Sequence, residues 1–370
     1  MTRNFCLWIL LGLGACSQPP EVRLFPADLY PEQLSAWGVV VRRGDALVFT
    51  SRAQPYELNS PLFSDYALKL RTIWLPPGTT AQFNADEAFD FPTGTIVTKT
   101  FFYPRVMGAN LTTLAAWRGW SGDVEAINFT DYEIIETRLL VRQSDQWDAL
   151  AYVWQGNDAH LKITGAIRRF EIELDQQTAK LNYLVPSRNE CAACHATNHS
   201  TGAIQPIGLK ARHLNRSYPG DEYNQLSIWQ NKGLLSGMPS LDQVQKTARM
   251  EDAAASVDGR ARGYLDINCG HCHNEKGAAD TSGLFLDART TSVRQLGYCK
   301  APIAAGTGSG GRLYSIVPGQ PDASILIYRL EITDPGDRMP ELGRTLIHQE
   351  GVALLRQWVA EIPGSCIVEA

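Results

Sequence analysis

The stretch FEIELDQQTAKLNYLV, residues 170–185, decides how the first half of the chain folds. Phe170, Ile172 and Leu174 alternate with acidic residues, and apolar residues alternate again after the polar turn. Successive side chains of a β-strand point to opposite faces, so this pattern predicts a half-buried β-hairpin. Near residue 187 the sequence changes from strand-rich to helical and loop-rich. We therefore expect one domain to end just after this hairpin.

Strand signals also dominate the sequence before the hairpin. TIVTKTFFY at 95–103, TRLLVR at 137–142 and ALAYVW at 149–154 are rich in β-branched and aromatic residues. Many short strands with regular turns predict an antiparallel β-sandwich or barrel-like domain over residues 31–186. Charges on strand faces are usually solvated or paired, but five of them are candidates for binding a ligand. These are Asp65, Lys69, Arg71, Glu136 and Arg138.

Length and charge exclude several classes of protein. The chain has 370 residues, 44% of them hydrophobic, which is enough for two or three domains with their own cores. Its formal net charge is −5 and its pI is near 5.8, so it lacks the basic surface of a nucleic-acid-binding protein. It has no run of 18 apolar residues, which argues against several membrane spans.

The first residues predict an export signal. Arg3 precedes a short apolar stretch, and LGAC at 13–16 is similar to the lipobox of bacterial lipoproteins. We expect a signal peptide over residues 1–15, lipid on Cys16 and a tether over residues 16–30. The alternative is an ordinary signal peptide with a chance cysteine. If Cys16 is lipidated, we expect the protein on the periplasmic side of the cell envelope, anchored to the outer membrane through its lipid alone.

Two cysteine motifs carry the chemistry. CAACH at 191–195 and CGHCH at 269–273 match the Cys-x-x-Cys-His pattern of c-type haem attachment. In that pattern the two thiols bond to the porphyrin and the histidine is the proximal iron ligand. We therefore expect two haem c groups. The haem-attaching residues are Cys191, Cys194, Cys269 and Cys272, and the proximal ligands are His195 and His273.

A four-cysteine zinc site is the alternative for these motifs. It is disfavoured because 74 residues separate the two pairs, and zinc needs no histidine after either pair. Only 7 of the 370 residues are His, so a histidine behind both pairs by chance is rare.

The region 251–370 is predicted to be a second haem domain. Residues 252–267 and 351–362 have helical apolar stripes, and we expect these two helices to cross, with the small Gly263 allowing close approach. The pair resembles the terminal helices of small monohaem cytochromes c. Met339, in a Met-Pro loop ahead of the last helix, is the predicted distal iron ligand.

The region 187–250 is predicted to be a first haem segment with an abbreviated fold. Met238, also followed by proline, is the candidate distal ligand of its iron, and His213 and His199 are rivals. If Met339 does not serve the second haem, His348 is the next candidate. His271, inside the second motif, is expected to face outward without a ligand role.

Two further cysteines are expected to pair. Cys299 and Cys366 are left over, and in an oxidising compartment leftover cysteines usually form a disulfide. The nearby GTGSGG at 306–311 matches a dinucleotide-binding pattern by accident, since no strand precedes it and no helix follows.

Both cysteine motifs resemble a known family, together with NSPLFSDY at 59–66, the segment from FPTG at 91–94 through KTF at 99–101, and ETRLL at 136–140. The chain is similar to dihaem c-type cytochrome lipoproteins of Gram-negative bacteria, which are often encoded beside a parallel β-helix protein. The resemblance covers nearly the whole mature chain. It implies electron transfer, with the motif cysteines and histidines as haem-binding positions, and no established substrate.

These observations predict an α+β protein, in which the β-rich domain precedes a mainly α-helical cytochrome c region. The expected function is electron carriage between periplasmic or outer-membrane redox proteins. One alternative is a peroxidase-like dihaem enzyme, which needs an open iron position. The other is a ligand-binding β domain with the haems as relay or sensor.

Overall fold

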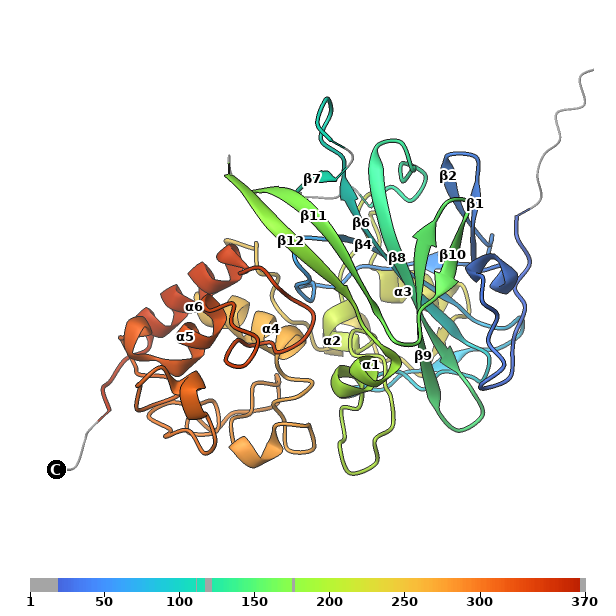
Figure 1. Ribbon diagram of the computed structural model, residues 1–370. Coiled ribbons are helices and arrows are strands. Elements are labelled where there is room, and N and C mark those ends of the chain that lie inside the picture. Colours follow the sequence, from blue (N-terminus) through green and yellow to red (C-terminus); the bar gives the residue numbers. More distant parts are fainter. Residues whose placement is uncertain (1–18, 111, 117–121, 175–176, 367–370) are drawn as a thin grey trace, which may run out of the picture.

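The computed structural model describes residues 19–110, 112–116, 122–174 and 177–366. The predicted signal peptide and Cys16, the predicted lipidation site, lie outside the described residues. Figure 1 shows a β-rich body with the C-terminal helices and loops at one side of it.

A six-stranded antiparallel sheet forms the centre of the β-rich body (Figure 1). Successive side chains of its strands point to opposite faces, and both faces carry buried apolar residues. Each face is covered by another part of the chain. In spatial order the strands are β10 (Asp158–Leu161), β9 (Trp147–Gln155), β8 (Tyr132–Arg142), β6 (Ile96–Pro104), β4 (Leu68–Trp74) and β3 (Gln54–Pro55).

One face of the sheet packs against the N-terminal segment. This segment contains the 3₁₀ helix η1 (Leu34–Trp37) and the hairpin of β1 (Val40–Arg43) with β2 (Ala46–Phe49). Trp37 is fully buried, and its indole N–H donates a hydrogen bond of 2.8 Å to the Tyr152 hydroxyl of the sheet. The buried residues of this segment and of the sheet form one apolar core.

The other face of the sheet is covered in part by the predicted hairpin. β11 (Ala166–Leu174) pairs antiparallel with β12 (Gln177–Val185), as the alternation predicts, and the short β7 (Thr113–Ala115) runs parallel to β11. Phe170 and Tyr183 of the hairpin are buried with Phe101 of the sheet in one apolar cluster.

The predicted boundary at residue 187 does not separate two cores. β13 (Leu235–Ser236) pairs with β5 (Ala81–Gln82), and one apolar cluster combines Ile73 and Val97 of the sheet with Trp229 from beyond the boundary. The two parts of the chain are therefore packed together.

The predicted mainly α-helical cytochrome c region is wrong. In the described residues after 187 the α-helices are short, the longest having 13 residues, and long loops connect them. Glycine and proline recur between residues 270 and 343, so helical periodicity is not sustained there. The protein is mostly β. The helices are α1 (Arg188–His195), α2 (Ala211–Leu214), α3 (Gln225–Asn231), α4 (Val257–Asn268), α5 (Ile325–Glu331) and α6 (Gln349–Glu361).

Short 3₁₀ turns interrupt the loops between these helices. They are η2 (Leu241–Gln243), η3 (Asp280–Ser282), η4 (Gly306–Ser309) and η5 (Pro321–Ala323). A disulfide joins Cys299 to Cys366, whose Cα atoms are 5.3 Å apart, and ties these loops to the segment after α6. Within the described ranges, none of the helices combines the length and the apolar character needed to span a bilayer.

Candidate functional site

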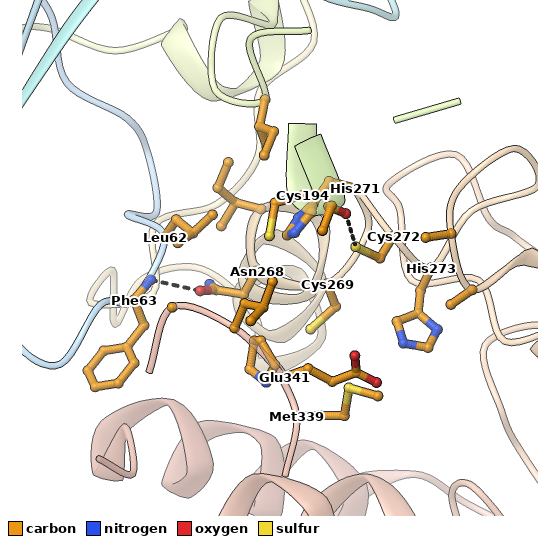
Figure 2. Close-up of a pocket in the computed structure, with 18 of the residues that line it drawn as sticks. Leu62, Phe63, Cys194, Asn268, Cys269, His271, Cys272, His273, Met339 and Glu341 are labelled. Carbon is orange, nitrogen blue, oxygen red and sulfur yellow. Dashed lines mark hydrogen bonds between the residues drawn. The ribbon is translucent and has the colours of Figure 1, made fainter. Parts of the chain in front are cut away.

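A cavity of about 550 Å³ lies where the central sheet, α1, the end of α4 and the loop 339–344 meet. Its wall is mainly apolar, and both Cys-x-x-Cys-His segments contribute to it. Figure 2 shows Cys194, Cys269 and Cys272 around this space, with Met339 and Glu341 on the opposite side.

The first segment lies on α1, which begins directly after β12. Ser187 caps this helix, because its hydroxyl accepts from the Glu190 N–H while the Glu190 carboxylate accepts from the Ser187 N–H. Cys191 and Cys194 are three residues apart and thus share a helix face. His195 ends the helix, and its Nδ1 lies 2.8 Å from the Gln205 carbonyl oxygen.

The second segment follows α4. The turn after Cys269 is closed by its carbonyl, which accepts from the N–H groups of Cys272 at 3.1 Å and His273 at 2.9 Å. The Nδ1 of His273 lies 3.2 Å from the Leu284 carbonyl oxygen. The two segments touch, since the Cys272 Sγ lies 3.8 Å from the Ala193 carbonyl oxygen of α1. The fold has thus brought together two cysteine pairs that 74 residues separate in sequence.

Both segments place neutral side chains in the cavity wall. Burial raises the pKa of Cys191 to about 11 and the pKa values of Cys269 and Cys272 to about 12, so these thiols keep their protons at neutral pH. Burial also lowers the pKa of His195 to about 4. A neutral imidazole whose Nδ1–H donates to a carbonyl leaves the Nε2 lone pair available, which is the case for His195 and His273.

These pKa directions limit the chemistry of the site. A thiol attacks a disulfide as its thiolate, and reactive cysteines have lowered pKa values. The raised values therefore disfavour rapid thiol exchange with dissolved disulfides.

We correct the prediction of two haem c groups on the geometry of the described residues. In that part of the chain, no group of three or more His, Cys, Asp or Glu side chains is arranged to hold a metal ion. The helical cytochrome frame expected to carry the groups is also absent there, because short helices and loops flank a β-sheet. Residues 191–195 and 269–273 line one shared cavity, where two separate centres were expected. Haem is accordingly not part of the function proposed below.

The predicted distal residues are dispersed. Met339 lines the cavity, whereas Met238 is 9% exposed, packs in the apolar cluster around Trp229 and does not line the cavity. His213 is buried with its Nε2 at 3.3 Å from Asp266, and His199 contacts the carbonyl of Lys276. These two histidines and Met238 contact other parts of the protein and do not line the cavity.

The remaining alternative, His348, lines the cavity. Its ring stacks on Phe63 with centroids 4.3 Å apart, and its Nδ1 lies 3.0 Å from the Tyr264 hydroxyl.

Two features of the site are missed by the sequence interpretation. His271 is buried in the cavity wall, although we expected it to face outward, and its Nδ1 has no hydrogen-bond partner among the described residues. Lys99 also lines the cavity, beside Arg71 and Arg138. The alternation of strand residues could have predicted that Lys99 points to a covered face, because it shares a sheet face with Val97 and Phe101.

Comparison with known proteins identifies no relative. No family model, no curated protein and no solved structure matches the chain.

Proposed function

We propose that the protein carries electrons between redox proteins of the cell envelope, and that the cavity shared by residues 191–195 and 269–273 is its redox site. The observation that carries the proposal is the meeting of four free cysteines from two distant segments around one mainly apolar cavity. Sulfur is the most readily oxidised atom among protein side chains.

One kind of electron storage fits this arrangement. Each Cys-x-x-Cys pair can form one disulfide, in which case two thiols release two electrons and two protons to the partner protein. One partner protein accepts these electrons, and another supplies the electrons that reduce the disulfide again.

A potentiometric titration of the purified protein tests the proposal. We expect a reversible redox step that is lost or shifted when Cys194 and Cys272 are both replaced by alanine. The control is Cys299→Ser with Cys366→Ser, which removes the disulfide outside the cavity and leaves the cavity step in place. The intact mass, with alkylation of free thiols, distinguishes a dithiol from a disulfide. A titration curve that is the same with and without Cys194 and Cys272 would contradict the proposal.

The envelope location rests on the lipobox-like sequence at residues 13–16. Lipid on Cys16 would hold the carrier at the outer membrane, facing periplasmic partners. Cys16→Ser should move the protein from the membrane fraction to the soluble fraction, measured by immunoblotting after cell fractionation. Unchanged membrane association of the variant would contradict the lipid anchor and leave the redox proposal intact.

A further inference from the structure

A row of three cations crosses the central sheet at the cavity. Arg71 of β4 lies opposite Lys99 of β6, and Lys99 lies opposite Arg138 of β8. Side chains of directly opposite residues project from the same face of a sheet, and all three line the cavity. Like charges placed opposite one another are destabilising, so this row is unfavourable for the sheet.

The carboxylates beside the row do not balance it. Arg71 is bound by Glu57 at 2.6 Å and Arg138 by Glu136 at 2.5 Å. Among the described residues Lys99 has neither an ion pair nor a hydrogen bond, and its ammonium lies 4.9 Å from the Phe101 ring centroid. The other charged residues of the cavity wall are Glu190, Lys300, Arg329, Glu341 and Arg344.

Donor groups of the row are also left without partners. The Arg71 Nη2 and the Arg138 Nε are buried, and each lacks a hydrogen-bond partner in the part of the chain described. Burial lowers the pKa of Lys99 well below its usual value, and the neighbouring Arg71 cation lowers it further. A buried, unpaired cationic donor is costly, and an anion placed against the row would offset that cost.

We infer that Arg71, Lys99 and Arg138 bind the acid group of an organic ligand whose apolar body occupies the cavity. The apolar walls and the volume of about 550 Å³ suit a small organic molecule. Guanidinium groups bind carboxylates and similar oxyanions through paired hydrogen bonds, and Lys99 adds a point charge. The inference concerns ligand binding and does not depend on the proposed redox function.

Two dyes with the same ring system test the charge requirement. Anilinonaphthalene sulfonate carries an acid group, and phenylnaphthylamine lacks it, so their affinities separate the anionic contact from the apolar one. Fluorescence titrations would be made on the wild-type protein, on Lys99→Met and on the charge-conserving Lys99→Arg. Lys246→Met, at an exposed position outside the cavity, is the matched control.

We expect Lys99→Met to weaken the binding of the sulfonate dye about tenfold to a hundredfold, which is the range for a hydrogen bond to a charged group. Binding of the neutral dye, and binding of either dye to Lys246→Met, should stay unchanged, and Lys99→Arg should restore the sulfonate affinity. Equal sulfonate affinity of the wild type and Lys99→Met would overturn the inference. Equal weakening of both dyes would also overturn it, because the substitution would then act through the shape of the cavity. The redox step of Lys99→Met, measured separately, reports on the proposed function.

Discussion

Asp266 of α4 shows how a single buried charge is accommodated. Its carboxylate is 4% exposed and accepts from the Arg212 Nε at 2.6 Å and Nη2 at 3.1 Å. Asp266→Asn would leave the Arg212 cation buried without its partner. We expect a loss of about 3–5 kcal/mol in the free energy of unfolding, measured by urea denaturation. Asp242→Asn, on the exposed surface, should change it by less than about 0.5 kcal/mol. A similar small change for Asp266→Asn would refute this role.

The same residue makes a prediction for pH. Burial alone would raise the pKa of Asp266, but His213 and Arg212 outweigh it and lower the pKa to about 2. Burial lowers the pKa of His213 itself to about 4, so Arg212 is the neighbouring cation at neutral pH. The lowered value means that the charge of Asp266 stabilises the fold above its unfolded pKa of about 3.9. The stability difference between wild type and Asp266→Asn should therefore hold down to about pH 4 and shrink as the pH falls toward 2.

At the level of elements, the packing of α4 on α6 depends on Gly351. A Cβ at this position would lie 2.5 Å from the Tyr264 hydroxyl and 2.7 Å from the His348 Nδ1. We expected Gly263 to allow the approach of the two helices, but its missing Cβ makes room for the Ala248 carbonyl oxygen at 2.6 Å. The small residue that α6 needs is thus on α6 itself.

Gly351→Ala should lower the free energy of unfolding by about 1–3 kcal/mol, because the added methyl group overpacks a filled interface. Urea denaturation measures the change. Gln357→Ala, on the exposed face of the same helix, is the control and should have little effect. Equal stability of Gly351→Ala and wild type would show that Tyr264 and His348 move aside at no cost.

At the scale of the whole molecule, the C-terminal part is attached to the β-rich body by polar contacts. The Asp65 carboxylate accepts from the N–H groups of Thr345 and Leu346, both at 2.7 Å. The Phe63 N–H donates to the Asn268 side chain at 2.8 Å, next to the second cysteine segment. These contacts hold the residues around the cavity in one arrangement.

The disulfide between Cys299 and Cys366 closes a long loop within the C-terminal part, since the two cysteines are 67 positions apart. Replacing both by serine should lower the free energy of unfolding by about 4 kcal/mol in the chain-entropy model. Urea denaturation with and without a reductant measures this. The reductant should destabilise the wild type by a similar amount and leave the double variant unchanged. A wild type as stable in reductant as without it would contradict the predicted contribution.

The sequence by itself determined the local features of this protein. The alternation in residues 170–185 determined the hairpin of β11 and β12, because each strand buries one face and exposes the other. The cysteine count indicated the pairing of Cys299 with Cys366. The local structure of residues 270–343 could not be predicted in this way, because their loops are held by scattered hydrogen bonds and have no sustained periodicity.

Only the tertiary structure decided which residues share the cavity. It placed residues 191–195 and 269–273 against each other and left Met238 outside the cavity wall. It also aligned Arg71, Lys99 and Arg138 across three strands. Spacing along the chain does not contain this information, because strand register and the packing of distant segments depend on how all buried surfaces fit together.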